Sequence, residues 1–131
     1  MAKEEPKKTK SKKSKRTLTV GNIYIQSSFN NTIVTITDES GNVVAWASAG
    51  SIGFKGTKKS TPYAAGLAAT SAIEKARAMG LSKANLFVNG VGSGREQAVR
   101  ALTNSRLEID VIKDTTPIAH NGCRPKKARR N

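Results

Sequence analysis

The chain has 131 residues, the size of one compact domain, and carries 23 Lys and Arg against 9 Asp and Glu, a net charge of +14. Such a charge repels itself unless a polyanion neutralises it, which predicts a nucleic-acid partner. Only 37% of the residues are hydrophobic, so the core must be small, and the single Cys123 excludes an internal disulfide or a multi-cysteine zinc site. No apolar run reaches the length of a membrane span and no secretory signal opens the chain, which predicts a cytoplasmic protein.

The positive charge is concentrated at the two ends of the chain. Residues 1–16 carry a net charge of +6 and residues 113–131 a net charge of +5, whereas the 96 residues between them carry only +3. We therefore expect a basic disordered extension (1–16), a globular α/β domain (17–116) and a basic, extended RNA-binding tail (117–131). A merely solubilising role for such charge runs is the alternative.

Three segments in the first part of the domain have the pattern of strands. Gly21–Ser27 alternates apolar and polar residues, Thr32–Thr37 is wholly β-branched, and Val43–Ser48 follows a polar turn. Together they predict a three-stranded antiparallel meander.

A helix is predicted next. Thr61 is a typical N-cap, Pro62 suits the first helical position, and Gly80 ends the segment. The alanine-rich stretch Tyr63–Met79 between them would lie close against a sheet. Its expected buried stripe consists of Leu67, Ala68, Ala72, Ile73 and Ala76.

The remaining elements complete a mixed sheet. We expect strands at Asn85–Asn89 and Leu107–Ile112, with a helix at Arg95–Ser105 whose start carries the capping-box pair Ser93 and Glu96. Two βα crossovers after the meander give a mixed sheet of about five strands, with helices packed on it in two or three layers, in a topology like that of ribonuclease H. The inward residues of the second helix would be Ala98, Val99, Ala101 and Leu102.

The connection Ala49–Thr61 is the first candidate binding segment. Its glycines let the backbone approach phosphates, and its lysines would neutralise them beside a helix N-terminus. Phe54 could stack on an unpaired base. The alternative is a solvated loop with Phe54 tucked into the core. The lysines concerned are Lys55, Lys58 and Lys59.

Catalytic interpretations of the chain fit poorly. The loop from Gly90 to Gly94 reads GxGxG rather than the dinucleotide pattern GxGxxG, and no second nucleotide-binding half follows. A metal-dependent nuclease would need several carboxylates, yet the helix offers only Glu74 and the predicted first and fourth strands offer none. His120 and Cys123 lie in a segment broken by proline and glycine, which cannot hold an activated thiolate. We therefore predict no catalysis, no cofactor and no metal.

Several stretches resemble the bacterial type of the small-subunit ribosomal protein S-eleven family. They read SFNNTIVTITD (Ser28–Asp38), GNVVAWASAGSIGFKGTKKSTPYAA (Gly41–Ala65), GREQAVRAL (Gly94–Leu102) and KDTTPIAHNGCRPKKARR (Lys113–Arg130). The resemblance implies a structural protein that binds 16S ribosomal RNA in the platform of the small subunit, near the messenger exit side and the E site. It also implies neighbouring platform proteins, namely the S-six and S-eighteen pair, S-twenty-one and S-seven, with messenger RNA nearby.

Residues and resemblance together predict the RNA contacts. The family loop usually reads GPGPGR, whereas Val91 and Ser93 replace its prolines in this chain. The predicted contacts are Asn30, Asn31, Phe54, Lys55, Lys58, Lys59, Arg95, His120, Asn121, Arg124, Lys126, Lys127, Arg129 and Arg130.

The sequence leaves two further properties open. Asn121 precedes Gly122, whose unhindered nitrogen favours a succinimide and then isoaspartate, although an ordinary rigid Asn-Gly turn is the alternative. Composition alone would also allow a free-standing RNA-binding or RNA-chaperone module outside the ribosome.

Overall fold

The structure, a computed structural model, describes residues 19–128. The expected extension 1–16 and the predicted contacts Arg129 and Arg130 therefore lie outside the described residues. The elements follow the predicted order of three strands, helix, strand, helix and strand, and a short 3-10 helix (η1) precedes the first α-helix. Their bounds are β1 (Val20–Ser27), β2 (Thr32–Thr37), β3 (Val43–Ser48), η1 (Gly56–Ser60), α1 (Pro62–Arg77), β4 (Lys83–Gly90), α2 (Arg95–Asn104) and β5 (Glu108–Asp114).

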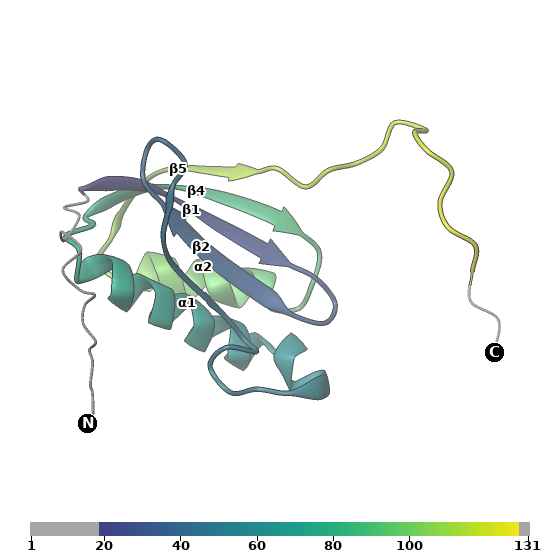
Figure 1. Ribbon diagram of the computed structural model, residues 1–131, viewed down its shortest axis with the longest axis horizontal. Coiled ribbons are helices and arrows are strands. Elements are labelled where there is room, and N and C mark those ends of the chain that lie inside the picture. The colour runs from purple at the N-terminus through teal and green to yellow at the C-terminus, as the bar shows by residue number, and fades with distance from the viewer. Residues whose placement is uncertain (1–18, 129–131) are drawn as a thin grey trace, which may run out of the picture.

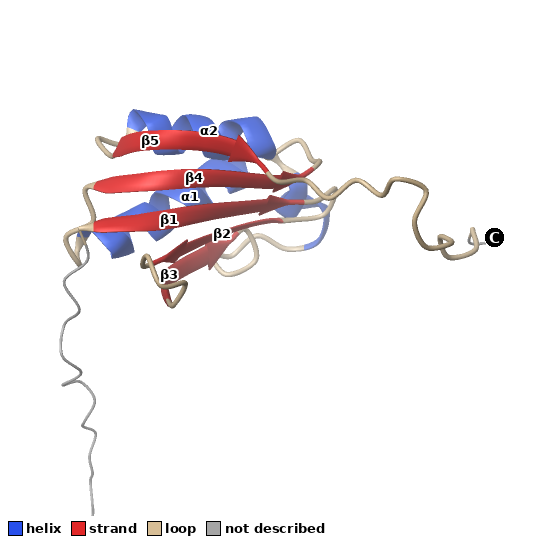
Figure 2. Cartoon of the chain, turned by 90° about the horizontal axis from the view of Figure 1, so that it is seen from above, coloured by secondary structure: helices blue, strands red, loops and turns tan. Residues whose placement is uncertain are grey.

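The strands form one mixed sheet in the order β3-β2-β1-β4-β5 (Figure 2). β1, β2 and β3 pair antiparallel, while β4 pairs parallel with β1 and β5 parallel with β4. The predicted meander and both βα crossovers are therefore confirmed. β4 begins two residues earlier than expected and β5 continues two residues further, to Asp114.

Both helices cover the same face of the sheet, so the domain has two layers (Figure 1). Along each of β1, β2 and β4 the apolar residues alternate, and the buried set faces the helices, as with Ile23 and Ile25 on β1. On α1 the buried positions are mostly alanines, which carry only a methyl group and let the helix approach the sheet closely. No helix within 19–128 is long and apolar enough to cross a bilayer.

The predicted stripe on α1 is correct except at Leu67. Ala68, Ala72, Ile73 and Ala76 are buried, but Leu67 keeps 38% of its surface exposed. The close approach of an alanine surface leaves no room for a leucine between helix and sheet, so Leu67 lies at the flank of the helix. On α2, Ala98 and Leu102 are buried, whereas Val99 and Ala101 are only partly buried against the core.

The capping box predicted at the start of α2 does not form. The N-cap is Gly94, with no side-chain cap. The Ser93 hydroxyl instead donates to the carbonyl oxygen of Ser60, at the end of η1. Gly94 is packed tightly against neighbouring elements, which fixes where the helix begins and turns Ser93 toward η1.

At the outer edge of the sheet, α1 also reaches β3. The ammonium of Lys75 donates to the carbonyl oxygen of Trp46 at 3.0 Å and lies 5.9 Å from the centre of the indole ring. The aliphatic stem of Lys75 thereby spans from the helix layer to the edge strand.

The glycines between β4 and α2 are required by close packing. Gly90 has a φ of +95°, and a Cβ on it would overlap the carbonyl oxygen of Ser27. A Cβ on Gly92 would overlap the carbonyl oxygen of Ser28. A Cβ on Gly94 would lie 2.6 Å from both the Ala65 Cβ and the Thr32 Oγ1. The loop therefore lies directly on the β1–β2 turn.

Because Gly94 has an ordinary helical φ, its requirement for glycine is one of space alone. We expect Gly94→Ala to lower the free energy of unfolding by about 1–3 kcal/mol, as overpacking does. Gly50→Ala is the matched control, because its Cβ would make only ordinary contacts, with the Lys59 Cδ at 3.5 Å and the Ser48 Oγ at 3.9 Å, and should change stability by less than about 0.5 kcal/mol. Chemical denaturation of both variants checks this, and equal stabilities would contradict the packing argument.

Candidate nucleic-acid interface

The predicted binding segments meet at one edge of the sheet. β1, β4 and β5 run parallel, so their carboxyl ends lie together, and the antiparallel β2 starts at the same edge where β3 ends (Figure 1). The β1–β2 turn, the β3–α1 connection, the β4–α2 loop and the C-terminal segment all leave from this carboxyl edge. In open α/β sheets this is the edge where ligands bind, because loops and helix N-termini gather there.

The β1–β2 turn is a compact structure held by its own side chains. The Ser28 hydroxyl accepts from the amides of Asn30 and Asn31, at 3.3 and 3.2 Å. The Asn31 Oδ1 accepts from the amide of Thr32 at 2.8 Å, so the predicted contact Asn31 retains chiefly its NH₂ group for a ligand. The predicted contact Asn30 is exposed.

Phe29, on the same turn, was missed by the sequence reasoning. This residue is 77% exposed, so its side chain takes no part in the core. An aromatic residue between polar turn residues could have signalled this, because core aromatics are normally flanked by strand periodicity. The ring offers a stacking surface beside Asn30 and Asn31.

The β3–α1 connection presents the predicted lysines. Lys55 and Lys58 are exposed, and Lys59 is half-buried with its stem alongside Gly50. Phe54 is half-buried and meets the ring of Tyr63 edge-on, with 6.0 Å between ring centres. Phe54 is therefore neither in the core nor free on both faces.

The anion site expected at the start of α1 is partly filled by the chain itself. Thr61 caps the helix, because its hydroxyl accepts from the amide of Ala64 at 3.2 Å. Pro62 at the first position has no amide hydrogen to offer. The lysines, rather than the helix terminus, are thus the main attraction for phosphate in this connection.

Arg95 opens α2 at the same edge, but its guanidinium is already engaged. It donates to the carbonyl oxygen of Gly90 and to the carboxylate of Asp114, both at 2.7 Å. Hydrogen bonds from Thr116 and from Arg95 hold the pKa of Asp114 well below its usual range, so the carboxylate is ionised at neutral pH. These two bonds use two of the five guanidinium N–H groups.

Beyond Thr116 the chain runs away from the domain without helix or strand (Figure 1). Residues 117–128 are all exposed, and Asn121 has a positive φ of 63°. Cys123 is exposed and carries a free thiol. The exposed predicted contacts in this segment are His120, Asn121, Arg124, Lys126 and Lys127.

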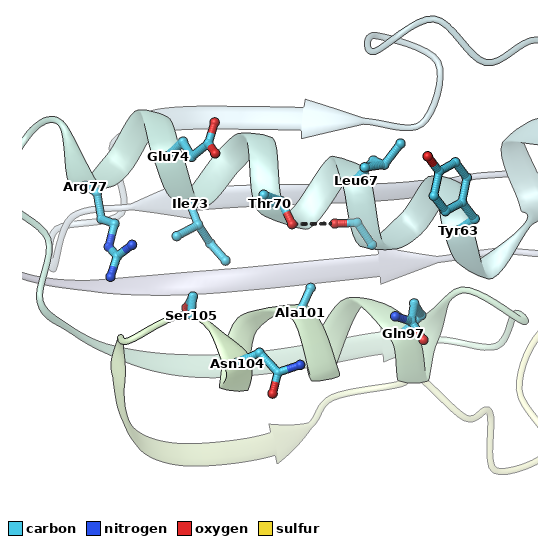
Figure 3. A pocket seen from close by; sticks show the side chains of 11 residues that line it. Tyr63, Leu67, Thr70, Ile73, Glu74, Arg77, Gln97, Ala101, Asn104 and Ser105 are labelled. Atoms are coloured by element: carbon cyan, nitrogen blue, oxygen red, sulfur yellow. Dashed lines mark hydrogen bonds between the residues drawn. The ribbon is translucent and has the colours of Figure 1, made fainter.

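A separate groove runs between α1 and α2 on the surface of the helix layer (Figure 3). It measures about 480 Å³ and is lined by apolar residues such as Leu67 and by polar residues such as Gln97 and Asn104, with one acid, Glu74, and one base, Arg77. No group of three or more His, Cys, Asp or Glu side chains that could hold a metal ion occurs in residues 19–128. The charged groups that suit a polyanion are at the carboxyl edge instead.

Comparison with known proteins identifies the family of the chain. Residues 21–130 match the family model described as "Ribosomal protein S11". The chain is also 56% identical, over 119 residues, to proteins named "Small ribosomal subunit protein uS11" from Borreliella burgdorferi (strain ZS7) and Borreliella afzelii (strain PKo). These alignments cover 91% of this chain and 92% of each relative. The chain belongs to the ribosomal protein S11 family.

Proposed function

We propose that the carboxyl edge and the C-terminal segment bind 16S ribosomal RNA in the platform of the small subunit, near the messenger exit side and the E site. Membership of the S11 family makes the chain a structural component of the small ribosomal subunit and not an enzyme. The observation that carries the RNA-binding proposal is the meeting of the lysine loop, the polar β1–β2 turn and the basic tail at one edge of the sheet.

Electrostatics supports this assignment of surfaces. The tail region 113–131 alone has a net charge of +5, against only +3 for the 96 residues before it that follow residue 16. Lys55, Lys58 and Lys59 add positive charge at the same carboxyl edge, beyond the end of β3. Phosphates of ribosomal RNA would neutralise both segments, and the released counterions would drive association.

The extended tail suits a narrow space between RNA helices. Pro117 and Pro125 prevent a continuous helix, and the described tail side chains are all exposed, so none of them is committed to the protein core. Arg124 can bind a phosphate through two parallel N–H groups, which a lysine cannot do. His120 and Phe29 offer rings for stacking on unpaired bases.

The neighbours that this placement proposes are the platform proteins S-six, S-eighteen, S-twenty-one and S-seven, with messenger RNA passing nearby. A free-standing RNA-binding module is the alternative. Co-sedimentation with small subunits after a high-salt wash separates the two, because a free-standing module would wash off.

The first prediction concerns salt. Affinity for isolated 16S RNA should fall with salt along a log–log slope that grows by about 0.7 for each phosphate contacted on single-stranded regions. Lys58→Gln should reduce the slope by about 0.7. Lys83→Gln, at the opposite edge of the sheet, should leave it unchanged. A slope near zero for the unmodified chain would contradict the electrostatic assignment.

The second prediction concerns the tail. Truncation after Thr116 should shift the melting temperature only slightly, because the described part of the removed segment is exposed. Affinity for 16S RNA should fall about tenfold or more, with a matching loss of incorporation into small subunits. A full-length chain with Arg124, Lys126 and Lys127 changed to Gln tests whether the loss of affinity comes from the missing charge or from the missing length of the tail. Unfolding of the truncated chain would make the tail part of the core, and normal incorporation would exclude it as an anchor.

The third prediction concerns Asn121. Its exposure and the following glycine should permit succinimide formation, so aged protein should contain isoaspartate at this position. Asn89-Gly90 is an internal control, because it lies in β4 and its Gly90 amide donates to the Thr116 hydroxyl. Peptide mapping by mass spectrometry should find deamidation at Asn121 and not at Asn89, and Gly122→Ala should suppress it. Only unmodified Asn121 in aged protein would refute the idea.

A further inference from the structure

Arg95 joins three parts of the carboxyl edge through its planar guanidinium. It stands at the start of α2, one nitrogen donates to the carbonyl oxygen of Gly90 at the end of β4, and another donates to Asp114 at the end of β5. Two directed bonds from one rigid fork fix both distance and angle between the strand ends. The side chain is only about one-third exposed.

Thr116 closes the same arrangement from the other side. Its hydroxyl donates to the Asp114 Oδ1 at 2.6 Å, and its amide donates to the same oxygen at 3.0 Å. The hydroxyl oxygen in turn accepts from the amide of Gly90 at 3.1 Å. Gly90, Arg95, Asp114 and Thr116 thus form a closed ring of hydrogen bonds, in which each Asp114 oxygen has its own partners.

The C-terminal tail begins directly after the last residue of this ring, Thr116. Thr116 is followed by Pro117, and a residue before proline is restricted to extended conformations. The amide of Thr115 also donates to the carbonyl oxygen of Val88 at 2.8 Å, so the chain is bound to β4 up to the residue before Thr116. The direction in which the tail leaves is therefore set by these contacts.

We propose that Arg95, Asp114 and Thr116 form a latch that aims the C-terminal tail at its RNA site, so that Arg95 is a positioning residue rather than primarily a phosphate ligand. This inference rests on the proposed function of the carboxyl edge and deepens it. It also accounts for an acidic residue at an edge that attracts phosphate, where a carboxylate would otherwise only repel the ligand.

The substitution Asp114→Asn distinguishes the two roles by the sign of its effect. If Arg95 were a phosphate ligand, removing its acidic partner would free the guanidinium and strengthen RNA binding. For a latch the same change weakens binding, because Asn has one acceptor oxygen where Asp has two and cannot serve Arg95 and Thr116 together. If the aimed orientation falls to about one-tenth of the population, the Kd for 16S RNA rises about tenfold.

A double-mutant cycle with the tail truncation tests whether the effect acts through the tail. In the chain ending at Thr116, Asp114→Asn should cause no loss of RNA affinity, because nothing remains to be aimed. A purely structural role of Asp114 would weaken both chains alike. Hydrogen exchange at the amides of Gly90 and Thr116 should accelerate in the full-length variant, as the direct sign of an open latch.

Asp110→Asn is the matched control. Asp110 lies earlier on β5 and pairs with Lys83 at 3.5 Å, outside the latch, so its replacement should not weaken RNA binding. If Asp114→Asn unfolds the domain, the same measurement is made on Thr116→Val and Thr116→Ser. Valine removes the hydroxyl that bonds to Asp114, and serine keeps it. Weaker binding by the valine variant alone supports the latch. Tighter or unchanged binding by Asp114→Asn, or a loss that persists in the truncated chain, overturns it, while the effect of truncation itself still reports on the proposed function.

Discussion

Close backbone approach is the constraint on which the rest of this structure depends. α1 presents alanines to the sheet, and the segment between β4 and α2 lies against the β1–β2 hairpin and α1 at three glycines where no Cβ has room. Both contacts are possible because the residues there are alanine or glycine, whose side chains are a methyl group or a hydrogen atom. Since the aromatic content is only 5%, the small core gains its packing from closely approaching aliphatic side chains rather than from aromatic rings. The directions of the strands place four chain segments at the carboxyl edge.

The consequence for binding is a division between a tightly packed domain and a segment that makes few contacts with it. Residues 19–116 contain the core and the hydrogen-bonded turns, while the described residues after Thr116 are exposed. Under the proposed function, such a segment becomes ordered on its ligand and loses conformational entropy on binding. Fixing the direction of its first residues lowers that entropic cost, because fewer orientations have to be searched.

Most of the fold could be predicted from the sequence, because the local signals agree with the tertiary contacts. The alternation of Ile23 and Ile25 and the Thr61-Pro62 helix start each matched the structure. Leu67 and the Ser93–Glu96 pair were predicted wrongly, since their fates depend on how closely α1 and Gly94 approach distant residues. The position of the binding loops at one edge followed from strand direction. The engagement of Arg95 by Asp114 could not be foreseen, because it joins residues nineteen positions apart through a register shift between β4 and β5.

The contact between Lys75 and Trp46 has a consequence for solubility. β3 is the last strand on its side of the sheet, and the exposed backbone groups of such a strand can pair with a strand of another molecule. The amide of Ala49 donates toward β2, to Thr32, so the alternation of the strand turns the carbonyl of Trp46 outward. The ammonium of Lys75 donates a hydrogen bond to that carbonyl oxygen and places a positive charge beside the strand. The lysine thereby makes this edge of the sheet less open to pairing with a strand of another molecule.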